Sequence, residues 1–190
     1  MALTAYLPVF NTEYHGTTIQ VAGTFTASYS ILSSLSRIAT GKLSDKIGGG
    51  KSTAMGLSCI LIGSVVLALS SPGNVHNFNQ YFGLFFMGFG GGFTNAAVYK
   101  WIPKVEPTGK AQVGGLVGGV GAFGGFVFPL FLGYSKDNFE NGQARGVFTY
   151  SLFSIIGIML TICVINSVKS TAEKKKVHPE YEVAGKGEVC

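Results

Sequence analysis

The chain has 190 residues, of which 47% are hydrophobic and only 12% are charged, and 28 of them are glycine. Average proteins have about 25% charged residues and about 7% glycine, so this composition favours packed membrane helices and argues against a soluble core. The formal net charge is +5, and the three cysteines and three histidines are too scattered for a disulfide framework or a metal site. We predict no metal, no other cofactor and no nucleic-acid partner.

Apolar segments separated by short polar stretches follow one another along the chain. They cover residues 1–10, 18–43, 53–71, 78–102, 111–134 and 147–168. A helix needs about 20 residues to cross a bilayer, so the first segment is half a span and the others supply four or five complete ones. We predict an all-α fold, a polytopic membrane helix bundle over residues 1–168, followed by a disordered cytoplasmic tail over residues 169–190.

Lysine and arginine are unevenly distributed among the turns. If residues 41–52 face the cytoplasm, only Lys136 and Arg145 lie on the opposite side. The cytoplasmic side then holds Lys42, Lys46, Lys51, Lys100, Lys104, Lys110, Lys169, Lys174, Lys175, Lys176 and Lys186. Cytoplasmic loops are enriched in these residues, so the bias predicts this orientation and a cytoplasmic carboxyl terminus. The first segment then ends outside the cell, and we expect further sequence before Met1.

Arg37 is the only charge within residues 18–40. If Asp45 lies at the membrane surface, Arg37 lies eight residues deeper, which is roughly 12 Å at helical rise. That depth approaches the middle of a hydrocarbon core about 30 Å thick. A charge there usually marks a substrate path or a buried partner, and the alternative is a side chain that snorkels to the interface.

Glycines recur four residues apart in two segments. The pairs are Gly88/Gly92, Gly114/Gly118, Gly115/Gly119 and Gly121/Gly125. Such pairs allow helices to approach closely in lipid, or they leave room for a small ligand. Their position near Arg37 favours a narrow pathway.

Asn95 lies in the same region and is able to hydrogen-bond either a substrate or another helix. Lys100 lies between two aromatic residues and is interpreted as an interfacial anchor.

Residues 41–51 read GKLSDKIGGGK and resemble a cytoplasmic loop motif of the major facilitator superfamily. The residues that carry this likeness are Gly41, Asp45, Lys46, Gly48 and Lys51. Residues 35–41, which include Arg37, resemble the eighth helix of nitrate/nitrite porters. Residues 88–103 are similar to their tenth helix, and residues 115–129 resemble their glycine-rich nitrate signature in helix eleven.

The resemblance implies the carboxy-terminal half of a nitrate/nitrite porter in the plasma membrane, with the end of helix seven and helices eight to twelve, and a missing amino-terminal half. Transport would proceed by alternating access around a midplane site. The residues expected to line the path of nitrate or nitrite are Arg37, Asn95, Gly118, Gly121, Gly124 and Gly125.

Two alternatives stay open at this stage. One is a facilitator for another small or organic anion, and the other is a non-transporting membrane remnant or subunit that binds partner helices. We predict that the chain is not an enzyme, because no group of its residues resembles a catalytic constellation.

Overall fold

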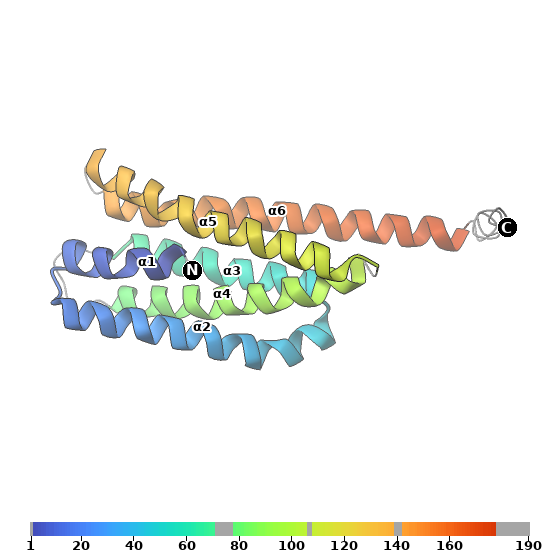
Figure 1. Cartoon of the computed structure of the whole chain (residues 1–190), viewed down its shortest axis with the longest axis horizontal. Coiled ribbons are helices and arrows are strands. Elements are labelled where there is room, and N and C mark those ends of the chain that lie inside the picture. Colours follow the sequence, from blue (N-terminus) through green and yellow to red (C-terminus); the bar gives the residue numbers. More distant parts are fainter. Residues whose placement is uncertain (1, 71–77, 106–107, 139–141, 178–190) are drawn as a thin grey trace.

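The computed structural model describes residues 2–70, 78–105, 108–138 and 142–177, and every regular element within them is a helix (Figure 1). The elements are α1 (Ala2–Val9), the π-helix η1 (Phe10–Tyr14), α2 (Ile19–Ile47), α3 (Gly49–Ala68), α4 (Phe78–Val105), α5 (Lys110–Asn138) and α6 (Gly142–Val177). The predicted all-α membrane helix bundle is therefore confirmed.

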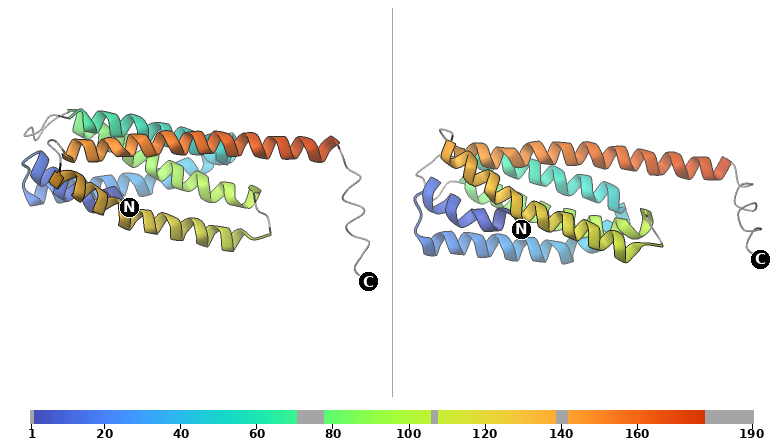
Figure 2. Two further views of the ribbon diagram at one scale, coloured as in Figure 1. Left: turned by 90° about the horizontal axis from the view of Figure 1, so that it is seen from above. Right: turned by 45° about the horizontal axis from the view of Figure 1, so that its top comes forward.

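The long helices lie side by side along the longest axis of the molecule. Figure 1 shows α2 along one edge, α5 and α6 along the other, and α3 and α4 between them. α6 extends beyond the other helices in both views of Figure 2. The most extensive packing is between α3 and α4, whereas α4 and α5 barely touch. The apolar core lies where α1, α3, α4 and α6 meet and includes Leu7, Phe10, Leu67, Leu84, Met87 and Val147.

Four glycines bring α3 and α4 into backbone contact. Gly56 and Gly63 on α3, and Gly83 and Gly90 on α4, are each spaced seven residues apart, so each pair lies on one face of its helix. A Cβ at Gly63 would lie 2.7 Å from the Met87 backbone nitrogen, and a Cβ at Gly90 would lie 2.7 Å from the Gly56 carbonyl oxygen. No side chain fits at these positions, so the glycines determine how closely the two helices pack.

The connection from α2 to α3 is a single residue. The predicted segments, residues 18–43 and 53–71, left residues 44–52 as the connection, and that was wrong, because α2 continues to Ile47 and α3 begins at Gly49. Gly48 has a φ of 94°, a conformation that side-chain-bearing residues rarely adopt, and its N–H donates to the Ser44 carbonyl at 3.0 Å.

Gly49 and Gly50, which follow Gly48, are needed for helix packing and not for the turn. A Cβ at Gly49 would lie 2.6 Å from Cβ of Trp101, and a Cβ at Gly50 would lie 2.7 Å from Cγ1 of Ile165. Gly49 and Gly50 therefore allow the start of α3 to lie directly against α4 and α6.

Several predicted helix ends were wrong. The first helical segment does not stop at Phe10 but continues through η1, because Asn11 is fully buried and its side chain accepts a hydrogen bond from Gln80 of α4. α4 passes through Pro103 and ends at Val105, since a proline in the last turn removes only one backbone hydrogen bond.

The predicted disordered tail also begins later than expected. α6 continues through residues 169–177, because extending an existing helix through lysine, glutamate and alanine carries no nucleation cost. Residues 178–190, the rest of the predicted tail, lie outside the described residues.

Fewer helices than predicted have the composition of a membrane span. Within the described ranges, three segments are long and apolar enough: Gly49–Ala68, Lys110–Phe131 and Gly146–Val168. α2 and α4, with 29 and 28 residues, have the length of a span. Their serine, threonine and glycine content lowers their hydropathy, and these two helices supply much of the wall of the cavity described below.

Replacement of Gly63 by alanine tests the contact between α3 and α4. The new methyl group would meet the α4 backbone, so we expect Gly63→Ala to lower the free energy of unfolding by about 1–3 kcal/mol. Gly119→Ala on α5 is the matched control, because nothing lies within 4 Å of its Cβ position, and it should be neutral or slightly stabilising. Thermal unfolding in detergent micelles measures both, and equal unfolding temperatures would contradict the close α3–α4 contact.

Candidate functional site

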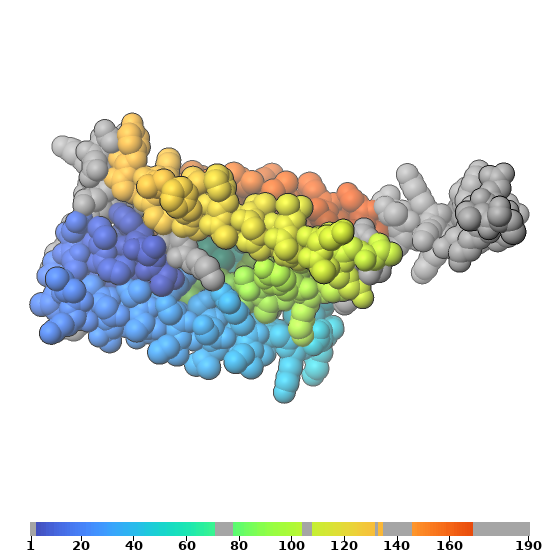
Figure 3. All heavy atoms as spheres, viewed as in Figure 1, coloured from blue at the N-terminus to red at the C-terminus, as the bar shows by residue number. Residues whose placement is uncertain are grey.

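A cavity of about 630 Å³ opens between α2, α4 and α5. Figure 3 shows the surface hollowed between α2 (blue) and α5 (yellow). All six residues that the sequence assigned to a substrate path line this one cavity: Arg37, Asn95, Gly118, Gly121, Gly124 and Gly125. The fold thus brings together residues from three helices, although binding by any of them remains a prediction.

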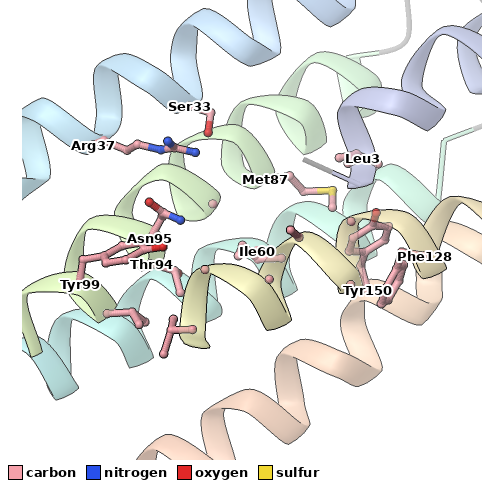
Figure 4. Close-up of a pocket in the computed structure, with 18 of the residues that line it drawn as sticks. Leu3, Ser33, Arg37, Ile60, Met87, Thr94, Asn95, Tyr99, Phe128 and Tyr150 are labelled. Carbon is pink, nitrogen blue, oxygen red and sulfur yellow. The ribbon is translucent and has the colours of Figure 1, made fainter. Parts of the chain in front are cut away.

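Arg37 lies on the cavity face of α2. Tyr29, Ser33 and Arg37 follow one another four residues apart on that helix, and all three line the cavity. In Figure 4 the guanidinium extends toward Ser33, away from the Asp45 end of α2. A side chain that snorkelled to the nearer interface would take the opposite direction.

The charge of Arg37 is not neutralised within the described parts of the chain. The side chain is exposed, and neither an ion pair nor a hydrogen bond holds it there. Since Arg37 donates through a planar guanidinium and accepts nothing, the cavity offers a free cationic donor group.

Asn95 presents an amide to the same space from α4. It is exposed to the cavity, and Figure 4 shows it across from Arg37. Among the described residues it makes no hydrogen bond to another helix, so the interhelical alternative considered for Asn95 finds no support. The side chain has donors and an acceptor available to a bound molecule.

The glycines of α4 and α5 have different environments. Gly88 and Gly92 pack against α2: a Cβ at Gly88 would lie 3.2 Å from the Tyr29 ring, and one at Gly92 would collide with the Ser33 carbonyl oxygen. On α5, nothing lies within 4 Å of the Cβ positions of Gly121 and Gly124. Close helix packing therefore accounts for Gly88 and Gly92 of α4, whereas Gly121 and Gly124 of α5 leave free space in the cavity.

Gly118 is the place where α5 approaches α4. A Cβ there would lie 3.1 Å from the hydroxyl oxygen of Tyr99. Because α4 and α5 otherwise barely touch, this contact bounds the cavity.

The charged motif holds the end of α2 against α4. The Lys100 ammonium lies 2.5 Å from Oδ2 of Asp45 and donates to the Gly41 carbonyl oxygen at 2.5 Å. Lys100 was expected to be an interfacial anchor, which stays a prediction, and the structure shows that it bridges two helices. Lys46 and Lys51 are exposed, so Gly41, Asp45 and Gly48 are the motif residues with a structural role here.

Sequence reasoning did not select several other residues that line the cavity, notably Tyr29, Ser33, Tyr99 and Tyr150. The four-residue spacing from Arg37 back to Ser33 and Tyr29 would have found the α2 pair. Tyr150 lies on α6, and no spacing along the chain links it to Arg37.

A sequence model of the Major Facilitator Superfamily matches residues 1–129. The "Probable nitrate/nitrite antiporter NarK1" of Thermus thermophilus is 29% identical over 97% of this chain and 45% of its own length. The "Nitrite extrusion protein" of Bacillus subtilis is 26% identical, with 95% and 43% covered, and the "Nitrate/nitrite transporter NrtP" of Nostoc punctiforme is 27% identical, with 96% and 34% covered. The chain thus spans less than half the length of these relatives, and no solved structure matches it.

The Lys100 bridge predicts which of two substitutions lowers the stability of the fold more. Lys100→Met removes both contacts to α2, whereas Asp45→Asn leaves the bond to the Gly41 carbonyl in place. Both Lys100 and Asp45 are more than one-third exposed, at 37% and 64%, so we expect a loss of at most about 1 kcal/mol for Lys100→Met and a smaller one for Asp45→Asn. Thermal unfolding measures both, and a larger loss for Asp45→Asn would contradict this geometry.

Proposed function

The chain belongs to the Major Facilitator Superfamily, and we propose that it forms part of a transporter that carries nitrate or nitrite across a membrane by alternating access. In this mechanism two groups of helices rock around a site near the middle of the bilayer, so that the site opens to one side at a time. The cavity between α2, α4 and α5 is the proposed site.

The observation that carries the proposal is the unneutralised Arg37 in the cavity. A guanidinium presents a rigid planar fork of donors, which suits a planar oxyanion. Hydrogen bonds between charged groups are stronger than neutral ones, so the anion would supply the negative charge that the described residues around Arg37 lack. Asn95 would add an amide contact, and the open α5 face would leave space for a small ion. The names of the relatives support nitrate and nitrite as the anions.

We propose that this chain supplies one wall of the site and that a second group of helices closes it. The support is that the relatives are more than twice as long as the part that aligns with this chain, together with the hollowed face between α2 and α5 in Figure 3. The second group would correspond to the amino-terminal half of the transporter. Transport would then require both groups.

The proposed orientation places the Gly48 turn and the end of α6 on the cytoplasmic side of the plasma membrane. The distribution of lysines supports it, because Lys42, Lys46, Lys51 and Lys100 all lie at the end of the bundle that holds Gly48. Arg37 then lies between the two surfaces, where an alternating-access site is expected.

Replacement of Arg37 tests the proposed function directly. In the complete transporter, Arg37→Lys keeps the charge but loses the bidentate geometry, so nitrate affinity should fall at least about tenfold. Arg37→Ala should abolish binding. The measurement is isothermal titration of the purified proteins with nitrate.

Lys46→Gln is the matched control, because Lys46 is a second exposed cation on α2 that does not line the cavity. It should bind nitrate as the parent does. An Arg37→Lys protein with the affinity of the parent would show that Arg37 does not hold the anion.

The α5 glycines provide a second test, which separates blockage from misfolding. Gly121→Leu places its side chain in the free space of the cavity, since nothing lies within 4 Å of the Cβ position. Nitrate uptake into liposomes should fall at least about tenfold while the unfolding temperature changes little. Gly119→Leu, on the same helix but outside the cavity lining, should leave uptake largely intact. Equal uptake by both variants would place the pathway elsewhere.

A further inference from the structure

The side chain of Tyr29 runs along the cavity wall toward Arg37. Its ring lies beside Gly88, with Cδ2 and Cε2 at 3.2 Å and 3.4 Å from the Cβ position of that glycine, and its hydroxyl lies 3.8 Å from the Cβ position of Gly91. α2 and α4 run in the same direction in Figure 1, and the sequence order Gly88, Gly91, Asn95 leads toward Arg37. The tyrosine hydroxyl therefore points along α4 toward Asn95.

Two glycines make this position possible. With any side chain at Gly88, the Tyr29 ring would have to move by a few tenths of an ångström. With no side chain at Gly91, the hydroxyl borders open cavity. The glycines that pack α4 against α2 therefore also fix the direction of one polar side chain.

The hydroxyl of Tyr29 is available to a bound molecule. No hydrogen bond within the described parts of the chain uses it, and it is not one of the enclosed polar atoms. The hydroxyl of Tyr150, which also belongs to a residue that lines the cavity, is enclosed. Tyr29 is thus the tyrosine that offers a donor to the cavity from the helix that carries Arg37.

The two side chains converge although their residues are eight positions apart, which is roughly 12 Å along the helix axis. The Arg37 guanidinium extends toward Ser33 (Figure 4), and the Tyr29 hydroxyl points in the opposite sense, toward the level of Asn95. The space between them is lined by Ser33 and Gly91.

We propose that Tyr29 is a further substrate-positioning residue, whose hydroxyl donates a hydrogen bond to the anion held by Arg37 and favours nitrate over nitrite. The inference rests on the proposed function. A guanidinium fork engages two acceptor oxygens. Nitrate has a third oxygen that remains for Tyr29, whereas nitrite has only two oxygens, so the tyrosine contact distinguishes the two anions.

The experiment compares Tyr29→Phe with the parent in the complete purified transporter, by titration with sodium nitrate and with sodium nitrite. Phenylalanine keeps the ring beside Gly88 and removes only the hydroxyl. Nitrate affinity should fall about tenfold, as expected for loss of one hydrogen bond to a charged group, and nitrite affinity should change much less. Ser30→Ala is the control, because the Ser30 hydroxyl bonds the Thr26 carbonyl at 2.9 Å and does not line the cavity.

Each other result overturns the inference. Unchanged nitrate affinity in Tyr29→Phe would show that the hydroxyl does not touch the anion, and equal losses for nitrate and nitrite would show that it does not distinguish them. A Tyr29→Phe protein that does not fold would show that the hydroxyl is structural. In all three cases nitrate binding by the parent leaves the proposed function standing, whereas a parent that binds neither anion overturns the proposed function and this inference together.

Discussion

The backbone contact between α3 and α4 is the constraint on which the other helices depend. It exists because Gly56, Gly63, Gly83 and Gly90 face one another and admit no side chain. In lipid the hydrophobic effect does not drive helices together, so close van der Waals packing of small residues has to hold them. α2 packs against this pair at Gly92 of α4, and α6 packs against it at Gly50 of α3. Four helices therefore share one centre that is packed through glycines.

α5 does not pack into that glycine-rich centre. The cavity forms because α5 stays apart from α4 along most of its length. Its contacts are mainly with α6 and α1, and it approaches α4 through Gly118 and Tyr99. At Gly114, Gly115, Gly119, Gly121, Gly124 and Gly133 of α5, nothing lies within 4 Å of the Cβ position. α5 is therefore packed on the side of α6 and α1 and carries glycines on the side of α4. This leaves a gap next to α4, and Arg37 and Asn95 line it.

The two cations Arg37 and Lys100 differ in whether a neighbouring group neutralises their charge. Lys100 lies between Asp45 and the Gly41 carbonyl, which satisfies its charge and joins α4 to the end of α2. Arg37, eight residues before Asp45, has no such partner among the described residues. An unneutralised charge within a membrane is costly, and this cost supports the binding role proposed for Arg37.

The sequence by itself determined the helical class, the approximate helix positions, the superfamily and the six candidate residues that meet in one cavity. Apolar length, an isolated arginine and a local motif are all readable along the chain. Only the tertiary structure decided which glycines pack and which leave room, because glycine permits both and the neighbouring helix determines the outcome. The partner of Lys100 and the direction of Tyr29 also depend on residues of another helix, and spacing within one helix does not encode them.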